Sequence, residues 1–490
     1  MRAFDQPRFG RARLDASLRV AVLGGGLAGV AAACVLAERG AQVTLVEREA
    51  SLGGRLAAWP VQVAGETFEM DRGFHAFFRH YYNLRALLRR VDPALDGLRP
   101  LTDYPILTPA GPLSFADLPR NALLTLWPLM RQVGLGIGDL RRVRVGHALA
   151  MLGWHPQRTP ARWDGVSAEQ WLQGLNFPPA ARLRLLDVFA HSFFNPTGEF
   201  SAADLLMLFH YYFFGNREGL VFDVARRPFG QWLWQPFERH LQALGVQLRL
   251  GCAVQAVGRH DAGWQVRTGD DTLTADAVVL ALDVPGLRGV LQASPALGDA
   301  VSGPLGAQRA TRPFAVWRLW LDRPVADGRA AFAGTAGYDI LDNVSVYSAF
   351  HAPSRDWAAR HGGAVLELHG YGLTCDDEAE VRRRLLAALH AVYPETAPAQ
   401  VLGEQFLWRA DCPAFPPGSA AGRPGVSTAD PTLAVAGDHV RLPFASALME
   451  RAVASGVLAA NALLADRRVD PAPLWIGPQR GLLAPPLRAA

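Results

Sequence analysis

The sequence predicts an α/β fold with two interleaved domains, and three observations predict it. A glycine-rich stretch near the N-terminus lies between two apolar runs, with a helix-forming segment inside it. Near the C-terminus, a strand is again followed by a turn, here Gly-Asp, and then by a long helix. A region of alternating apolar residues lies between this segment and the N-terminal one. Together they predict a Rossmann-type parallel-sheet domain built from separated segments, with an interleaved domain of mixed sheet and helices.

The first segment, "VAVLGGGLAGVAAACVLAERGAQVTLVE", begins at Val20 and contains a GxGxxG pattern. The glycines are Gly24, Gly26 and Gly29. The first makes the tight turn after a strand, the second lets the backbone approach a pyrophosphate, and the third lets the helix pack closely on the strand. Glu47 ends the second strand, where a carboxylate can accept hydrogen bonds from ribose hydroxyls. The segment therefore predicts a dinucleotide site, against the alternative of a simple glycine-rich turn.

The residues after the second strand favour FAD over a nicotinamide dinucleotide. In "REASLGGRLAAW", a second turn formed by Gly53 and Gly54 precedes Arg55. These residues add donors for the pyrophosphate and open a path toward the isoalloxazine ring. The alternative is an ordinary loop with a surface arginine.

The C-terminal segment "PTLAVAGDHVRLPFASALMERAVASG" predicts the other half of the same site. Asp438, after Gly437, is placed to bind the ribitol chain of FAD. A helix that begins around Leu448 and Met449 would direct its N-terminal amides at the pyrimidine edge of the flavin. A plain core helix is the alternative. Between the segments, alternation predicts an antiparallel ribbon in which Val254 contacts adenine, followed by the core strand "DAVVLALD".

These patterns predict the domain division. We expect a flexible arm over 1–17, an FAD-binding domain over 18–100, 236–292 and 425–468, and a C-terminal extension over 469–490. The remaining segments, 101–235 and 293–424, are expected to form a substrate and membrane-contact domain.

The three segments, in this order, resemble the superfamily of FAD-dependent amine oxidases and phytoene desaturases. The stretches "DRGFHAFFRHYYNLRALLRRVDP" and "AGDHVRLPFASALMERAVASG" resemble the carotenoid (phytoene and zeta-carotene) desaturases, and most of all the β-carotene desaturase/methylases of the isorenieratene synthase type. The resemblance implies a two-domain, GR2-like flavoprotein fold, non-covalent FAD, an apolar polyene substrate, and a quinone or oxygen as electron acceptor. The candidate cofactor-binding residues are Gly24, Gly26, Leu27, Ala28, Gly29, Glu47, Arg48, Gly53, Gly54, Arg55, Gly73, Phe74, His75, Val254, Gly437, Asp438, Ala447, Leu448 and Met449.

Other classes of function are disfavoured by what the 490 residues contain. The sequence has no lysine, whereas flavin amine oxidases commonly hold a water against flavin N5 with one. The formal net charge is only +4 and the arginines are scattered, which argues against nucleic acid. The four cysteines form no CxxC pair, so neither a metal site nor a disulfide framework is indicated, and a cytoplasmic setting is expected.

Two stretches are candidates for handling an apolar substrate. The aromatic run "RGFHAFFRHYY" predicts a wall against polyene or flavin, with His75 as the catalytic candidate; a buried aromatic helix start is the alternative. The Leu-, Trp- and Met-rich stretch from Leu118, edged by arginines, is typical of helices lying in a membrane interface, although core-facing helices give the same pattern. We expect peripheral membrane association.

The predicted reaction is desaturation of a carotenoid with hydride transfer to flavin N5. The resemblance adds a methyl shift within a ring that becomes aromatic. A flavin-dependent isomerase, an amine oxidase-type enzyme and a non-catalytic carotenoid carrier stay as alternatives.

Overall fold

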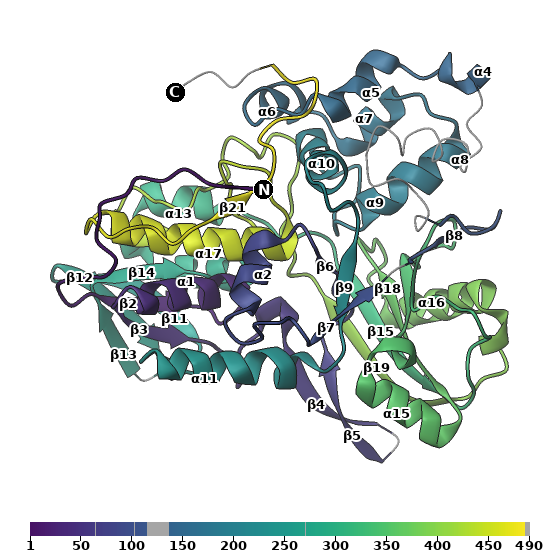
Figure 1. Cartoon of the computed structure of the whole chain (residues 1–490), viewed down its shortest axis with the longest axis horizontal. Helices are drawn as coiled ribbons and strands as arrows, with labels where there is room; N and C mark the ends of the chain where they lie inside the picture. Colours follow the sequence, from purple (N-terminus) through teal and green to yellow (C-terminus); the bar gives the residue numbers. More distant parts are fainter. Residues whose placement is uncertain (64, 102, 115–136, 270, 486–490) are drawn as a thin grey trace.

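The central feature is a five-stranded parallel sheet. The computed structural model describes residues 1–485 except 64, 102, 115–136 and 270 (Figure 1). The strand order is β10-β3-β2-β14-β20. In that order the strands are Gln247–Arg249, Gln42–Val46, Arg19–Leu23, Ala277–Leu280 and Leu433–Val435. Strands from three distant parts of the chain thus pair in one sheet, which confirms the predicted α/β flavoprotein-type architecture.

Alternate side chains of the central strand β2 bury against two different layers. Val20 and Val22 pack in the cluster that contains helices α1 (Leu27–Glu38) and α17 (Leu448–Ala465). Ala21 and Leu23 point to the opposite face, against a three-stranded antiparallel sheet and helix α12. This sheet comprises β11 (Val254–His260), β12 (Gly263–Thr268) and β13 (Asp271–Ala275), and α12 spans Val284–Gln292. A strand buried on both faces accounts for the continuous apolar run around the glycine motif.

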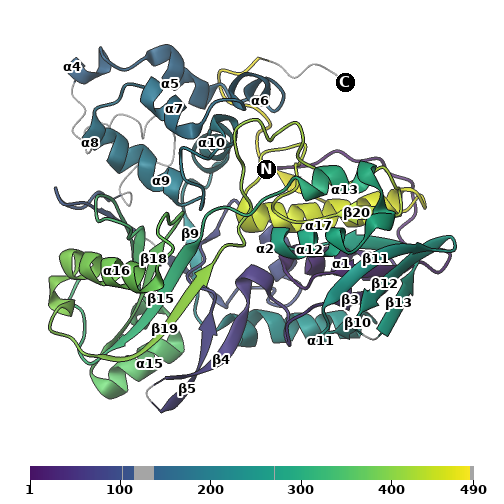
Figure 2. The same cartoon turned by 180° about the vertical axis from the view of Figure 1, so that it is seen from behind.

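Helices α1 and α17 lie along each other (Figures 1 and 2). Every residue of α1 from Leu27 to Ala37 is buried, as expected for a helix that is apolar on all sides. A Cβ atom added to Gly456 of α17 would overlap the carbonyl oxygen of Ala28. Small residues at this crossing therefore set the distance between the two helices that flank the predicted cofactor site.

The second domain contains a six-stranded mixed sheet and a lobe of helices (Figure 2). The sheet order is β19-β15-β18-β17-β16-β8. In that order the strands are Val401–Arg409, Phe314–Leu321, Ala364–Gly370, Asn343–Val346, Phe332–Thr335 and Ile106–Leu107. Helices α14 (Tyr347–Phe350), α15 (Ala352–His361) and α16 (Glu378–Val392) accompany this sheet.

The helical lobe lies between β8 and β15 in the chain and contains several short helices. They are α4 (Ile137–Leu140), α5 (Val145–Leu152), α6 (Arg158–Trp163), α7 (Ala168–Gly174), α8 (Pro179–Arg182), α9 (Val188–His191) and α10 (Ala202–Phe209). Leu183–Asp187, His210–Phe214 and Gly230–Trp234 form π-helical turns. The stretch from Leu118 that was expected to lie in a membrane interface falls mostly outside the described residues, apart from α4 and α5.

The remaining elements are short sheets and helices. They are β4–β5 (Ala58–Val63 and Glu66–Asp71), β6 (Phe77–Phe78), β9 (Phe222–Ala225), β7 (Leu98–Leu101), α2 (Tyr82–Leu88), α11 (Gln235–Ala243) and α13 (Asp299–Gly306). Of these, α11 and α13 pack on the first domain. The first residues differ from the expected flexible arm. Arg2–Ala3 form strand β1, which pairs with β21 (Trp475–Ile476) of the C-terminal extension. Phe4 then stacks edge-on against Phe444 at 5.1 Å, so an apolar anchor and backbone pairing hold the arm in place.

One described helix, α17, is long and apolar enough to span a membrane by length and composition. Its apolar window is 72% buried inside the protein, where it packs against α1. This burial identifies α17 as a core helix of the first domain.

Candidate functional site

A cavity of about 1400 Å³ runs from the glycine motif into the second domain. Most of the predicted cofactor-binding residues line it, from all three separated segments of the first domain. The lining candidates are Gly24, Gly26, Leu27, Ala28, Glu47, Arg48, Gly53, Gly54, Arg55, Phe74, His75, Val254, Gly437, Asp438, Ala447, Leu448 and Met449. Gly29 and Gly73 do not line the cavity. A side chain at either position would crowd residues that do line it.

The glycine turn at the carboxyl end of β2 requires glycine at two positions. Gly24 has φ +113°, and a Cβ there would overlap the carbonyl oxygen of Ala281 on the neighbouring strand segment. A Cβ on Gly29 would overlap the carbonyl oxygen of Gly24. Glu47 fixes the same turn, because its Oε2 accepts a hydrogen bond from the Gly25 amide at 2.6 Å and its Oε1 accepts one from the Glu49 amide at 2.9 Å.

The second glycine turn brings Arg55 to Asp438. Gly54 packs against Gly26, since a Cβ on Gly54 would lie 3.1 Å from the Gly26 Cα. Arg55 then forms an ion pair with Asp438, which is buried. Burial alone would raise the pKa of Asp438, but the guanidinium of Arg55 outweighs it and lowers the pKa. The two residues that the sequence assigned to pyrophosphate and ribitol are therefore direct partners in the protein.

The start of α17 presents backbone donors to the cavity. Ala447 precedes the helix in an extended conformation, and no side chain caps the helix. Leu448 has φ +46°, an unusual value for a side-chain-bearing residue that marks a constrained backbone. A helix N-terminus without a side-chain cap favours an anionic group, and the flavin pyrimidine edge is the group expected there.

His75 lies in the cavity wall with one ring nitrogen occupied. Its Nδ1 donates to the Gly73 carbonyl oxygen at 2.8 Å, and its ring packs edge-on against Phe229 at 5.7 Å. Burial lowers the pKa of His75 to about 4, so the imidazole is neutral near pH 7. Of the neighbouring aromatic run, Phe78 and Tyr81 line the cavity. Tyr82 does not line it, and its hydroxyl donates to Glu218 at 2.6 Å.

Beyond the glycine turns, the cavity wall is rich in aromatic side chains. Its lining includes Tyr104, Phe189, Phe193, Phe194, Tyr212, Phe222, Phe332 and Phe415. Phe74 stacks on Phe332 with ring centroids 4.3 Å apart, which joins the segment near the flavin site to this aromatic wall. The aromatic stretch that follows Phe209 contributes Tyr212 and Phe222 to this wall.

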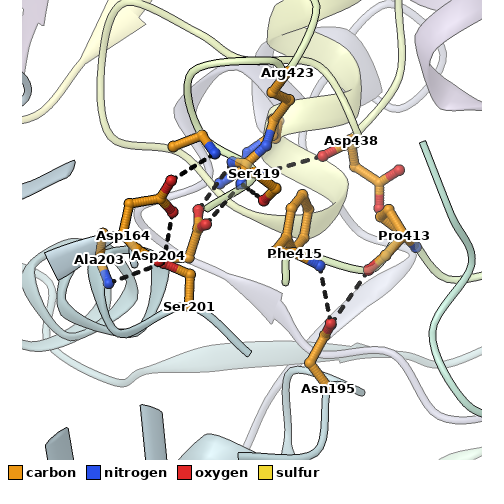
Figure 3. Close-up of polar contacts among 12 residues, drawn as sticks. Asp164, Asn195, Ser201, Ala203, Asp204, Pro413, Phe415, Ser419, Arg423 and Asp438 are labelled. Carbon is orange, nitrogen blue, oxygen red and sulfur yellow. Dashed lines mark hydrogen bonds and ion pairs between the residues drawn. The ribbon is translucent and has the colours of Figure 1, made fainter. Parts of the chain in front are cut away.

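A segment before β20 closes part of this wall through polar contacts (Figure 3). Asn195 donates from its Nδ2 to the Pro413 carbonyl oxygen at 3.2 Å and accepts from the Phe415 amide at 3.1 Å. Arg423 forms a bidentate pair with Asp204 of α10, at 2.9 and 2.7 Å. These contacts fix Phe415 in the cavity wall, where the Arg423 guanidinium lies 4.4 Å from its ring centroid.

The second domain contains a buried polar chain that was not predicted from the sequence. Arg318 of β15, Glu367 and His369 of β18, and Tyr371 are linked by hydrogen bonds, and His369 and Tyr371 line the cavity. The sequence signal for this chain was the presence of a charged residue inside each of the apolar strands "FAVWRLWL" and "AVLELHG", because a buried charge needs a partner. Among the described residues, no group of three or more His, Cys, Asp and Glu side chains is arranged to hold a metal ion.

The cradle fits FAD by the shape and chemistry of its donors. Two glycine turns leave open space where side chains would intrude, the Glu47 carboxylate lines the cavity at the position expected for a ribose, and the first residues of the uncapped helix α17 also line the cavity. The cavity then continues past this cradle into the aromatic part, so cofactor and substrate can meet there. Bound FAD supplies a two-electron acceptor at this junction.

Comparisons with known proteins agree with this geometry. Residues 27–464 match the family model described as flavin containing amine oxidoreductase. The chain is 47% identical over 479 residues to carotenoid phi-ring synthase from Streptomyces griseus, covering 96% of this chain and 93% of that one. It is 27% identical to carotenoid phi-ring synthase from Chlorobaculum tepidum, with coverages of 96% and 92%. A zeta-carotene desaturase from Synechocystis is 25% identical over 56% of this chain and 59% of its own.

Solved structures show the same fold at low sequence identity. A variant of putrescine oxidase superposes with a TM-score of 0.67 at 19% identity, covering 92% of this chain and 100% of its own. Cyclohexylamine oxidase from Brevibacterium oxydans gives a TM-score of 0.66 at 18% identity, with coverages of 92% and 99%. The chain therefore belongs to the flavin containing amine oxidoreductase family, as an FAD-dependent oxidoreductase of its carotenoid desaturase and phi-ring synthase branch.

Proposed function

We propose that this enzyme converts the terminal ring of a carotenoid into an aromatic ring, by FAD-dependent desaturation coupled to a methyl shift within the ring. The observation that carries the proposal is the continuity of one cavity, which joins the FAD cradle to an apolar, aromatic-lined arm. The 47% identity to a carotenoid phi-ring synthase supports a ring as the reacting end group. The absence of lysine from the whole sequence disfavours an amine oxidase.

The chain's own residues have three tasks in this reaction. Glu47, Arg55 and the start of α17 would hold the ribose, pyrophosphate and flavin edge of FAD. The aromatic walls around Phe74 and Phe332 would orient the ring and exclude water, which would otherwise add to an electron-deficient carbon. The methyl group moves between adjacent ring carbons, so no methyl donor is needed. Reoxidation by a quinone or by oxygen stays a prediction.

A membrane surface is the proposed source of the apolar substrate. Helix α5 exposes Val145 by 60% and Leu149 by 43%, one helical turn apart on the same face. Arg141, Arg142 and Arg144 flank them and are exposed, a composition suited to an anionic lipid interface. Leu183 is also exposed, five residues before Val188 of the cavity wall. We infer peripheral membrane contact through this helical lobe.

Anaerobic stopped-flow absorbance tests the proposed function. The FAD-loaded protein in detergent is mixed with β-carotene or monocyclic γ-carotene, and the flavin and polyene bands are followed together. Flavin bleaching with a matched polyene shift is expected, while acyclic lycopene, which has no ring to aromatise, is the control. A flavin that stays oxidised while β-carotene binds and isomerises would favour the isomerase, and one that stays oxidised with unchanged bound polyene would favour a carrier. Either result would contradict the proposal.

A further inference from the structure

A chain of hydrogen-bonded side chains leads from the core of the six-stranded sheet to the cavity wall. Glu367 Oε2 accepts from Arg318 Nε at 2.8 Å, and Glu367 Oε1 pairs with His369 Nε2 at 2.7 Å. His369 Nδ1 lies 2.8 Å from the Tyr371 hydroxyl, which also accepts from Asn343 Nδ2 at 3.0 Å. A charged, hydrogen-bonded chain that ends at the wall of the cavity is a candidate for a functional role.

The protonation of this chain follows from its partners. Arg318 is buried and lies beside Glu367, so the carboxylate is ionised; burial alone would raise the pKa of Glu367, but Arg318 and His369 outweigh it and lower the pKa to about 2. Glu367 Oε1 also accepts from the Phe74 amide at 2.6 Å. An acceptor-only carboxylate places the His369 proton on Nε2, which leaves the Nδ1 lone pair to accept from the Tyr371 hydroxyl.

The other charged groups near the chain are on neighbouring elements. Asp71 Oδ2 lies 3.8 Å from Arg318 Nη2, and the Arg318 guanidinium lies 3.8 Å from the Tyr347 ring centroid. Asp342 accepts from the Tyr371 amide at 2.7 Å through its Oδ2. Its other oxygen lies 3.3 Å from His191 Nδ1.

The position of Tyr371 is fixed by a constrained neighbour. Phe194 has φ +62°, and its ring centroid lies 4.4 Å from that of Tyr371. The Phe194 carbonyl oxygen accepts from Thr311 Oγ1 at 3.0 Å, which holds this backbone in place. Strain of this kind persists where a side chain must be placed accurately. The segment next to the flavin cradle touches the same chain, since a Cβ on Gly73 would lie 3.0 Å from His369 Cε1.

We propose that Tyr371 is the catalytic residue that accepts the proton lost by the substrate ring, and that it passes its own proton to His369 while Glu367 supplies the fixed counter-charge. This inference rests on the proposed function, which assigns the hydride and its electron pair to FAD. The ring C–H bond breaks and its electrons become the new ring double bond. The proton bonds to the Tyr371 oxygen, the original Tyr371 O–H bond breaks, and an N–H bond forms at His369 Nδ1.

A tyrosine is adequate for this task because a ring C–H next to a carbon that has lost hydride is strongly acidic. The resulting imidazolium lies 2.7 Å from the Glu367 carboxylate, an arrangement with the same logic as a hydroxyl–imidazole–carboxylate triad. His75, the candidate chosen from sequence, has no such carboxylate partner; its described hydrogen bond goes to the Gly73 carbonyl. Tyr371 and His369 therefore form a better acceptor than His75.

Single-turnover product formation from γ-carotene tests this assignment in the FAD-loaded protein. Tyr371→Phe keeps the ring that packs on Phe194, and His369→Gln breaks the next link independently. Each is expected to slow formation of the aromatic product by about 10²–10⁴-fold, with FAD content and carotenoid affinity unchanged. The double variant is expected to be no slower than the slower single variant, because the two residues act as one unit. A solvent deuterium isotope effect on the wild-type rate should vanish in Tyr371→Phe.

Tyr82→Phe is the matched control, since it removes a hydrogen-bonded tyrosine hydroxyl outside the cavity and should leave the rate unchanged. A Tyr371→Phe rate within about threefold of wild type, or single losses that multiply in the double variant, would overturn the assignment. If the wild type itself yields no aromatic product, the proposed function fails first and the proton assignment fails with it.

Discussion

Glu47 connects the backbone of the glycine turn to the expected ribose position. Its carboxylate accepts from the Gly25 amide at 2.6 Å and the Glu49 amide at 2.9 Å. Glu47→Gln would turn an amide N–H toward one of these donors and remove an acceptor for the ribose. We expect the FAD dissociation constant to rise about 10–100-fold, or about 1.4–2.7 kcal/mol, by flavin fluorescence titration of the apoprotein. Glu199→Gln, an exposed carboxylate paired with Arg312, should leave it unchanged. Equal affinity in wild type and Glu47→Gln would refute this role.

The Arg318–Glu367 pair gives a second prediction at the residue scale. The folded pKa of Glu367, about 2, lies below its ordinary 4.5. The stability that this group contributes is therefore complete above about pH 4.5 and is lost as the pH falls toward 2. Glu367→Gln should lower the free energy of unfolding at pH 7 by about 3–5 kcal/mol, because Arg318 stays buried with a weaker partner.

Urea unfolding between pH 2 and 7 measures this effect, with Glu395→Gln as the control. The pKa of Glu395 is also lowered to about 2, by its hydrogen bond to Arg329, but that pair is partly exposed. Its loss should cost at most about 1 kcal/mol. Equal losses in the two variants would contradict the buried-pair argument.

At the scale of elements, the contact between α1 and α17 holds the two halves of the FAD cradle together. Gly456 has no room for a methyl group, since a Cβ would overlap the Ala28 carbonyl oxygen. Gly456→Ala should lower the free energy of unfolding by about 1–3 kcal/mol and weaken FAD retention, because the helices must separate. Gly303→Ala in α13 is the control: its Cβ would meet nothing within 4 Å, so helix propensity predicts a gain of up to about 1 kcal/mol. Thermal unfolding with and without FAD checks both, and an unaffected Gly456→Ala would show that the helices can relax.

Much of the first domain could be predicted from sequence because its signals are local in the chain. The turn at Gly24, the acid at Glu47 and the start of α17 at Leu448 each depend on a few consecutive residues. The Glu367–His369–Tyr371 chain could not be predicted in this way. Glu367 and His369 lie on the core strand β18, whose apolar pattern predicts only packing, and Tyr371 follows that strand. The arrangement of the chain also depends on Phe74, Asn343 and Phe194, which come from distant parts of the sequence.

The N-terminal arm shows the same limit. An Arg-rich segment without apolar periodicity favours disorder, yet Arg2–Ala3 pair with Trp475–Ile476 at the other end of the chain. Pairing over such a separation leaves no mark in the local sequence.

At the scale of the whole molecule, the proposed route for substrate runs from a membrane surface through the helical lobe to the cavity. The double variant Val145→Asp/Leu149→Asp places charge on the exposed face of α5 and should reduce co-sedimentation with anionic vesicles by at least about tenfold. Turnover of detergent-solubilised carotenoid should be unchanged, because neither residue lines the cavity. Val401→Asp, at an exposed apolar position on β19, is the control. Unchanged vesicle binding in the α5 variant would contradict this route.

The most direct test of ring aromatisation follows a labelled methyl group. β-Carotene carrying ¹³C in both geminal ring methyls is incubated with the FAD-loaded protein and a quinone, and the product is analysed by NMR and mass spectrometry. We expect an aromatic ring formed by two successive two-electron oxidations, with one labelled methyl on its original ring carbon and the other on the adjacent ring carbon. A product that is only isomerised, is desaturated without methyl movement, or has lost the label would contradict the proposed function.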